Sequence, residues 1–240
     1  MLLYVYSSYR YYFDPTYILV LIGLVLSLWA QYMVNSNFKK YSKVRSMSGV
    51  TGAAVAERIL RSQGINDVRI EHVAGNLSDH YDPKNKILRL SDSTYNSTSV
   101  AALGVAAHEC GHAMQHANGY IPVKLRSVFV PVANIGSYAS WILILIGLLF
   151  TRSSGQAFLT AGIVCFAVTV VFHIITLPVE FNASSRAIRV LEGNGILYGD
   201  EIRGAKKVLG AAALTYVASA ATAILQLLRL IILFGGKRRD

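Results

Sequence analysis

The sequence has few charged residues for its length. Asp, Glu, Lys and Arg make up 15% of its 240 residues, whereas about a quarter of the residues in a soluble globular domain are charged. Hydrophobic residues make up 53% of the chain, and the mean hydropathy is +0.43. This shortage of charge excludes an ordinary soluble domain and favours a protein that lies largely within a membrane.

Acidic residues are particularly scarce. The chain has 13 Asp and Glu against 23 Lys and Arg, which gives a formal net charge of +10. A basic chain can bind nucleic acid, but these basic residues gather beside apolar runs, as in FKKYSKVR (38–45) and KRR (237–239). Cations that flank membrane segments explain this placement better than a DNA-binding face does. We therefore expect the lipid bilayer, and no nucleic acid, among the partners.

Cysteine is scarce as well. Cys110 lies within a histidine-containing motif and Cys165 within an apolar run, and the two do not form a CxxC pair. This usage argues against a disulfide framework. We expect both cysteines to be small buried residues.

Four long apolar runs divide the chain. Residues 15–34 carry no charge and lack a clear A-x-A cleavage site, and they are long enough to span a hydrocarbon core of about 30 Å. Residues 128–150 and 158–177, joined by the short stretch TRSSGQ, predict a transmembrane hairpin. Residues 208–234 contain Arg229, and the sequence leaves open whether this run spans the membrane or lies at its interface. We therefore expect a mainly α-helical membrane protein with three to four membrane helices.

The basic residues are distributed unevenly between the polar segments. Residues 35–127 contain twelve Lys and Arg and residues 178–207 contain five. The N-terminus and the hairpin turn contain one each, Arg10 and Arg152. Under the positive-inside rule, this asymmetry predicts that both polar segments lie on the cytoplasmic side of the cell membrane.

The first polar segment has the patterns of a small α+β domain. Residues 51–63 show helical apolar spacing, and residues 67–73 and 86–90 alternate between polar and apolar side chains as strands do. The stretch HYDPKN between those strands is rich in turn-forming residues. The cluster SDSTYNSTS then offers N-caps for a helix that runs to Asn118 and stops at Gly119.

That helix carries the motif HECGH. His108 and His112 are four residues apart, so both rings project from one helix face and can reach a single zinc ion. Glu109 between them is placed to act as a general base. With six His and six Glu in 240 residues, about 0.004 chance matches to this motif are expected. The alternative interpretation is a polar helix face or a hydrogen-bonded pair of histidines.

His116 continues the same series by one more turn. It lies about 12 Å along the helix axis from His108, which is too far to share one metal ion directly. The metzincin pattern needs a third histidine two residues later, and this sequence lacks one. We expect His116 to have a structural role or to orient a ligand.

A catalytic zinc site needs a third protein ligand and an open position for water. Glu180, in LPVEFNASSRA, directly follows the second arm of the predicted hairpin, and the histidine helix leads into the first arm. Because the arms are antiparallel and their turn is short, both ends are expected at one membrane surface. Alternatively, Glu180 complements the dipole of a helix that begins at Pro178. Other acids of the polar segment lack such a geometric argument: Asp79, Asp82 and Asp92.

The segments HECGH and VEFNASSRA, on a chain with several predicted spans, resemble the bacterial membrane-embedded neutral zinc metallopeptidases of the YugP type. These are distant relatives of the HtpX-like proteases. The resemblance covers nearly the whole chain, including SDSTYNSTSVAALGVAAHECGHA. It implies a gluzincin arrangement, in which His108, His112 and Glu180 bind one zinc ion. HtpX-like relatives carry an aspartate four residues after that glutamate, where this chain has Ser184. Its role in orienting a histidine is either missing here or taken by Asn182, Ser184 or Ser185.

A peptidase also needs groups that bind the substrate and stabilise the oxyanion. A strand beside the active helix commonly binds the substrate as an added strand, and residues 86–90 are the candidate for that edge. The spacing does not choose among three candidate oxyanion donors: His80, Tyr81 and Arg186. His173 lies within an apolar run, where an ionisable residue is a functional candidate or bonds a neighbouring helix.

The sequence therefore predicts a multi-pass membrane zinc endopeptidase that cleaves peptide or membrane-protein substrates at the cytoplasmic surface, with one zinc ion per chain and Glu109 as general base. The alternative is a non-catalytic membrane interaction or assembly protein that retains a metal site, but a purely structural site has no use for Glu109. We expect five parts. They are a membrane anchor (1–35), a catalytic part (36–127), a transmembrane hairpin (128–177), a cytoplasmic helix with the third zinc ligand (178–207), and a C-terminal membrane or interfacial helix with a basic tail (208–240).

Overall fold

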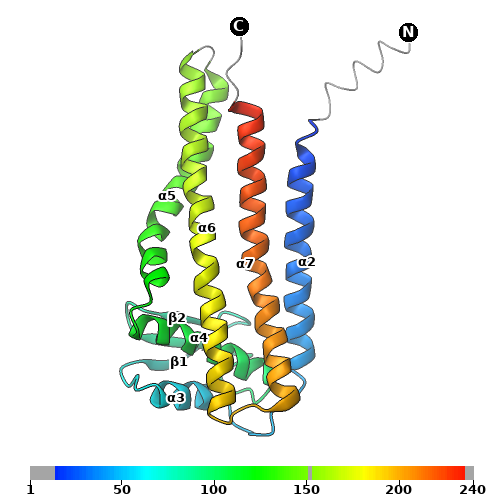
Figure 1. Ribbon diagram of the computed structural model, residues 1–240, viewed down its shortest axis with the longest axis vertical. Helices are drawn as coiled ribbons and strands as arrows, with labels where there is room; N and C mark the ends of the chain where they lie inside the picture. The colour runs from blue at the N-terminus through cyan, green and yellow to red at the C-terminus, as the bar shows by residue number, and fades with distance from the viewer. Residues whose placement is uncertain (1–13, 151–152, 236–240) are drawn as a thin grey trace, which may run out of the picture. The chain divides into compact units, whose positions relative to one another are not determined.

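A computed structural model describes residues 14–150 and 153–235 (Figure 1). Arg10, Arg152 and the basic tail 237–239 lie outside the described residues.

The chain forms two compact units. The first unit comprises Met1–Trp29, Ser127–Ile174 and Val217–Asp240. The second unit comprises Ala30–Arg126 and Ile175–Tyr216.

Four helices among the described residues are long and apolar enough to cross a membrane. They are α2 (Tyr17–Tyr41), α5 (Ile121–Leu149), α6 (Ser153–Gly193) and α7 (Gly199–Phe234). These helices confirm the expected mainly α-helical membrane protein with a small α+β part. The last apolar run, which the sequence left open, lies entirely within α7.

The expected start of a separate helix at Pro178 is wrong, because α6 continues through this residue. Proline removes one backbone hydrogen bond from a helix. The residues that follow outweigh that loss, since Val179 and Ala183 are completely buried and hold the helix in place. Glu180 therefore lies in the interior of a long helix, and the interpretation of Glu180 as a first-turn acid no longer applies.

In the first unit, the helices approach each other closely through small residues. The Thr222 hydroxyl of α7 donates a hydrogen bond to the carbonyl oxygen of Gly23 on α2 at 3.1 Å. A Cβ atom on Gly162 of α6 would lie 3.0 Å from the carbonyl oxygen of Ser140 on α5. Small residues allow such backbone approach between membrane helices.

Arg229, the charge within the last apolar run, is paired in the first unit. Its guanidinium lies 3.3 Å from the carboxylate of Asp14 and donates from Nε to the hydroxyl of Thr16 at 3.2 Å. It also lies over the ring of Tyr17, 4.5 Å from the centroid. These partners at the start of α2 compensate the charge, so α7 continues as one helix through this position.

The second unit contains a three-stranded sheet in the order β1-β3-β2. Strand β1 (Arg69–Val73) pairs parallel to β3 (Ile87–Ser91), and β2 (His80–Asp82) pairs antiparallel to β3. The strands predicted at 67–73 and 86–90 are confirmed, whereas β2 falls where turn residues were noted. Because β3 is the central strand, the expectation that residues 86–90 form the free edge is wrong.

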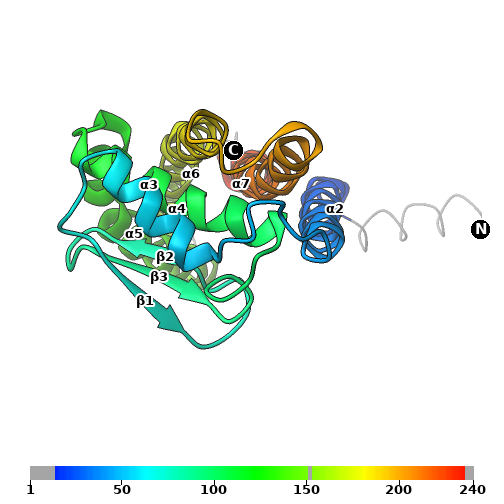
Figure 2. The same cartoon turned by 90° about the horizontal axis from the view of Figure 1, so that it is seen from below.

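The amphipathic helix α3 (Gly52–Ser62) and the largely buried helix α4 (Val100–Ala117) pack beside this sheet (Figure 2). Helix α3 is capped by Thr51 and helix α4 by Ser99, as serine and threonine do at helix starts. Both helices were predicted. Their apolar residues form one core with β3 and with the parts of α6 and α7 that belong to this unit.

Gly111 brings α4 and α6 into backbone contact within this unit. A Cβ atom at Gly111 would lie 2.5 Å from the carbonyl oxygen of Ala183. Real Cβ atoms do not approach a backbone oxygen this closely, so the two helices pack as they do because residue 111 has no side chain.

We expect the substitution Gly111→Ala to lower the stability of the protein by about 1–3 kcal/mol, because it forces α4 away from α6. Gly210→Ala is the matched control, since Gly210 is an exposed helical glycine with nothing within 4 Å of an added Cβ. This control should be neutral or stabilising by up to about 1 kcal/mol. Thermal unfolding in detergent measures both, and equal transition temperatures for the two variants would contradict the close contact.

Candidate metal centre

Helix α4 presents two imidazoles to the same point in space. His108 and His112 lie one turn apart, with ring centroids 4.7 Å apart and ring planes at 87°. Their Nε2 atoms are separated by 3.2 Å. Each histidine is largely but not completely buried.

Glu180 of α6 completes a triangle with these nitrogens. Its Oε2 atom lies 3.4 Å from Nε2 of His108 and 3.5 Å from Nε2 of His112. Ligand atoms that bind zinc tetrahedrally at about 2.0–2.1 Å are about 3.4 Å from one another. The three side chains, which come from two helices of one unit, therefore have the donor atoms and the spacing that a zinc ion requires.

The burial of Glu180 supports the same fit. The residue is 2% exposed, and its Oε2 atom accepts no hydrogen bond from the described residues. Leaving a buried polar atom without a partner costs about 1–3 kcal/mol, and more for a charged group. A cation at the centre of the triangle removes this cost.

Side chains behind the two histidines hold their rings. Oε1 of Gln115 accepts a hydrogen bond from Nδ1 of His112 at 3.1 Å, because the Gln115 amide nitrogen donates instead to the carbonyl oxygen of Val179 at 2.7 Å. This bond fixes the proton of a neutral His112 on Nδ1 and leaves the Nε2 lone pair for a metal. The hydroxyl of Ser184 lies 3.1 Å from Nδ1 of His108.

Arg126, in α5, holds the other oxygen of Glu180. Its Nη1 atom donates to Oε1 at 2.9 Å. A charge-assisted bond of this kind orients the carboxylate so that Oε2 faces the histidines. The hydroxyl of Tyr216, in α7, is also close enough to interact with the Glu180 carboxylate.

Glu109 is nearly buried and directly follows His108 in the sequence. It is 8% exposed, and its carboxylate accepts no hydrogen bond within the described part of the chain. Burial lowers the pKa of His112, but the nearby carboxylates of Glu180 and Glu109 outweigh this effect and raise the pKa above its usual value. The two carboxylates, Glu109 and Glu180, outnumber the single guanidinium of Arg126, so the charge of the site favours a cation.

Cys110 takes no part in this cluster. Its thiol is buried and donates to the carbonyl oxygen of Ala56 at 3.7 Å, and burial raises its pKa far above the usual range. The expected small buried role of Cys110 is confirmed. Cys165 is only partly buried, and neither cysteine forms a disulfide.

The structure does not bring the other candidate residues to the triangle. His116 is exposed and bonds the hydroxyl of Tyr81 at 3.1 Å. His80 lies near Arg89 on the sheet. Arg186 bonds Asn182, which also accepts a hydrogen bond from Gln115.

The remaining acids and His173 have other surroundings. Asp79 accepts hydrogen bonds from Ser91, Asp82 caps the turn before β3, and Asp92 bonds His72 and the backbone of Gly75. His173 lies in the first unit and packs edge-on against Phe172.

Three residues of this site were not predicted from the sequence. Gln115 lies three residues after His112 in the motif helix, and this spacing could have identified it as a partner of the ring. Arg126 and Tyr216 come from α5 and α7. Their positions depend on helix packing, and no local pattern in the sequence indicates them.

Comparisons with known proteins identify the family of this chain. Residues 16–235 match the family described as "Putative neutral zinc metallopeptidase". The chain is 46% identical over 216 residues to the "Putative membrane protease YugP" of Bacillus subtilis (strain 168), across 90% of this chain and 95% of the relative. No solved structure matches. Both matches support a protease function, and the chain belongs to this family of neutral zinc metallopeptidases.

Proposed function

We propose that the protein is a membrane-bound zinc-dependent endopeptidase in which His108, His112 and Glu180 bind one zinc ion. The triangle formed by their donor atoms, with sides of 3.2, 3.4 and 3.5 Å, carries this proposal. The histidines and the glutamate would form a gluzincin site with the HExxH motif, and the family supports zinc as the metal.

When bound, zinc supplies Lewis acidity that polarises a peptide carbonyl and makes water more acidic. Glu109 is the general base: its carboxylate takes a proton from the attacking water and passes it to the leaving amine. The absence of a protein donor to Glu109 among the described residues supports this role, because its oxygens stay free for water. Gln115 and Ser184 orient the two rings, and Arg126 orients Glu180.

Tyr216 is a better candidate for the oxyanion donor than His80, Tyr81 or Arg186. Its hydroxyl interacts with Glu180, whereas those three residues bond groups outside the triangle. A phenol beside the metal ligands can donate to a developing oxyanion.

The substrate strand would pair with β2, the edge strand beside α4. Among the described residues, the order β1-β3-β2 leaves one side of β2 without a partner strand, and β2 packs against the helix that carries the motif. An extended peptide can add to such an edge through backbone hydrogen bonds. We propose that this reaction takes place at the cytoplasmic membrane surface, because the positive-inside rule favours the cytoplasmic side for the basic segments of the second unit. We propose peptides or membrane-protein segments as the substrates.

The variant Glu109→Gln should retain zinc and lose hydrolysis of a generic substrate such as casein by about 10²–10⁴-fold, the contribution of a general base. Metal analysis and a turnover assay on the purified protein test this. The matched control is Glu57→Gln, an exposed acid on α3, which should keep full activity. A Glu109→Gln variant as active as the unsubstituted chain would refute the role of the base, and zinc bound without any turnover in the unsubstituted chain would favour a non-catalytic protein.

Glu180→Gln should weaken zinc binding by more than about 100-fold, because it removes a charged ligand. Loss of a hydrogen-bond partner of a ligand, for comparison, weakens metal binding by roughly 10–100-fold. Competition with a chromogenic chelator measures the affinity. Glu192→Gln, on the exposed side of the same helix, should bind zinc like the unsubstituted protein. Equal affinities in the two variants would mean that a different side chain completes the site.

Zinc binding should weaken as the pH falls through the raised pKa of His112. In the metal-free protein this ring binds its proton more tightly than a free histidine does, and the metal must displace that proton. Well below the pKa, the affinity should fall about tenfold per pH unit for each proton released. Chelator competition between pH 8 and pH 5.5 measures the slope, and a constant affinity over this range would contradict His112 as a ligand.

A further inference from the structure

A groove of about 440 Å³ lies between α6 and α7 in the second unit. Residues from Phe181 to Glu192 of α6 form one wall, and residues from Lys206 to Leu214 of α7 form the other. The two helices run side by side here and are joined by the short connection 194–198 (Figure 1). Ser184, whose hydroxyl lies 3.1 Å from Nδ1 of His108, is the one residue described around the candidate metal centre that also lines this groove.

The groove is polar at one end and apolar at the other. Arg189, Glu192 and Lys206 line the end near the connection. Phe181 and Leu214 line the opposite end, and further apolar residues lie between: Ile188, Leu209 and Ala213. The separation follows from the helices, since each carries its charged residues next to the connection and its apolar residues further away.

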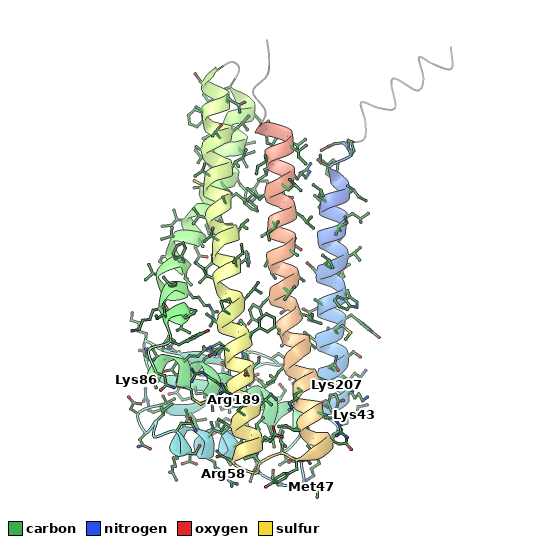
Figure 3. All side chains as sticks on the ribbon, in the orientation of Figure 1. Lys43, Met47, Arg58, Lys86, Arg189 and Lys207 are labelled. Carbon is green, nitrogen blue, oxygen red and sulfur yellow. The ribbon has the colours of Figure 1, made fainter. Side chains whose placement is uncertain are left out.

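The cations at the polar end of the groove outnumber the one carboxylate there. Within the described residues, neither Arg189 nor Lys206 forms an ion pair with a carboxylate, and Arg189 bonds only the carbonyl oxygen of Ser185. With Glu192 included, the end carries a formal charge of about +1, which complements one phosphodiester. Figure 3 labels Arg189 on α6 and Lys207, the exposed neighbour of Lys206, on α7.

The apolar end leads into longer apolar sequence on both helices. Residues 158–177 precede the groove residues of α6, and residues 217–234 follow those of α7. Phe181 and Leu214 give the groove an apolar end against which a hydrocarbon chain can pack. Gly210 lines the groove without a side chain, and nothing lies within 4 Å of a Cβ added there.

We propose that this groove binds an anionic glycerophospholipid, with its phosphodiester between Arg189 and Lys206 and one acyl chain directed towards Leu214. A free phosphate would leave the apolar part unfilled. An extended peptide would need backbone hydrogen bonds, and two helices offer none because their own ladders use these groups. The lipid matches both the charge and the apolar length of the groove.

The test uses the full-length protein, purified in a neutral detergent, stripped of lipid and mixed with phosphatidylglycerol or with phosphatidylcholine of the same acyl chains. Native mass spectrometry counts the retained lipid. The unsubstituted protein should retain one phosphatidylglycerol, and phosphatidylcholine should bind about tenfold more weakly. The double variant Arg189→Glu with Lys206→Glu should lower the affinity for phosphatidylglycerol by about tenfold or more, because both cations become anions.

Two further variants make the result specific to the groove. Lys207→Glu changes the same charge on the same helix but does not line the groove, so it should retain phosphatidylglycerol normally. Gly210→Phe keeps the charges and fills the apolar part, so it should lose the lipid as the double variant does. Circular dichroism without lipid identifies variants that fold normally, and only these are compared. Excess glycerol 3-phosphate should not displace the lipid, because it lacks an acyl chain.

The proposal is overturned if the double variant retains phosphatidylglycerol as well as Lys207→Glu does, or if phosphatidylcholine binds equally well. It is also overturned if glycerol 3-phosphate displaces the lipid, which would indicate a phosphate site alone. If the groove bound substrate chains instead, the same variants would lower casein hydrolysis in lipid-free detergent and leave phosphatidylglycerol retention unchanged. Lipid retention is independent of hydrolysis, so a failure of the proposed peptidase activity does not affect this test.

Discussion

The buried carboxylate of Glu180 is the constraint on which the candidate site depends. One of its oxygens bonds Arg126, while the other faces two imidazole nitrogens that are themselves 3.2 Å apart. A buried charge that has lost its partner destabilises a protein by about 3–5 kcal/mol. The cluster around Glu180 therefore needs positive charge at its centre. A proton on His112 supplies part of it, in agreement with the raised pKa of that ring. A divalent cation supplies more positive charge and can bind a lone pair of each histidine and of Glu180 at the same time.

This constraint is met by helices that are distant in the sequence and approach each other closely in the second unit. Gly111 lies one residue before His112, and its missing side chain lets the backbone of Ala183 on α6 come close. The residue that permits the contact thus lies within the motif itself. Val179 and Ala183, which flank Glu180, are completely buried and fix the rotation of α6 about its axis. The glutamate therefore points towards α4 because its apolar neighbours must be covered there.

Much of this arrangement could be predicted from the sequence, and the exceptions have physical causes. His108 and His112 lie on one helix, so helix geometry alone places their rings on the same face. The pairing with Glu180 followed from the antiparallel hairpin, although its helix does not begin at Pro178, because buried contacts outweigh the hydrogen bond that proline removes. Strand β2 was missed because three residues among turn formers carry no detectable period, and its pairing with β3 decides the structure instead. Arg126 reaches Glu180 only through the tertiary fold, and a single sequence contains no record of that contact.

Helix α6 carries both the candidate zinc ligand and the wall of the groove, and the period of an α-helix explains how. Glu180, Ala183 and Ala187 recur at intervals of three and four residues and face the buried side, whereas Phe181, Ser185 and Ile188 recur on the adjacent side and line the groove. Ser184 lies at the border of the two faces: its hydroxyl is 3.1 Å from Nδ1 of His108, and the residue also lines the groove. A molecule bound in the groove would therefore touch a residue that orients a zinc ligand.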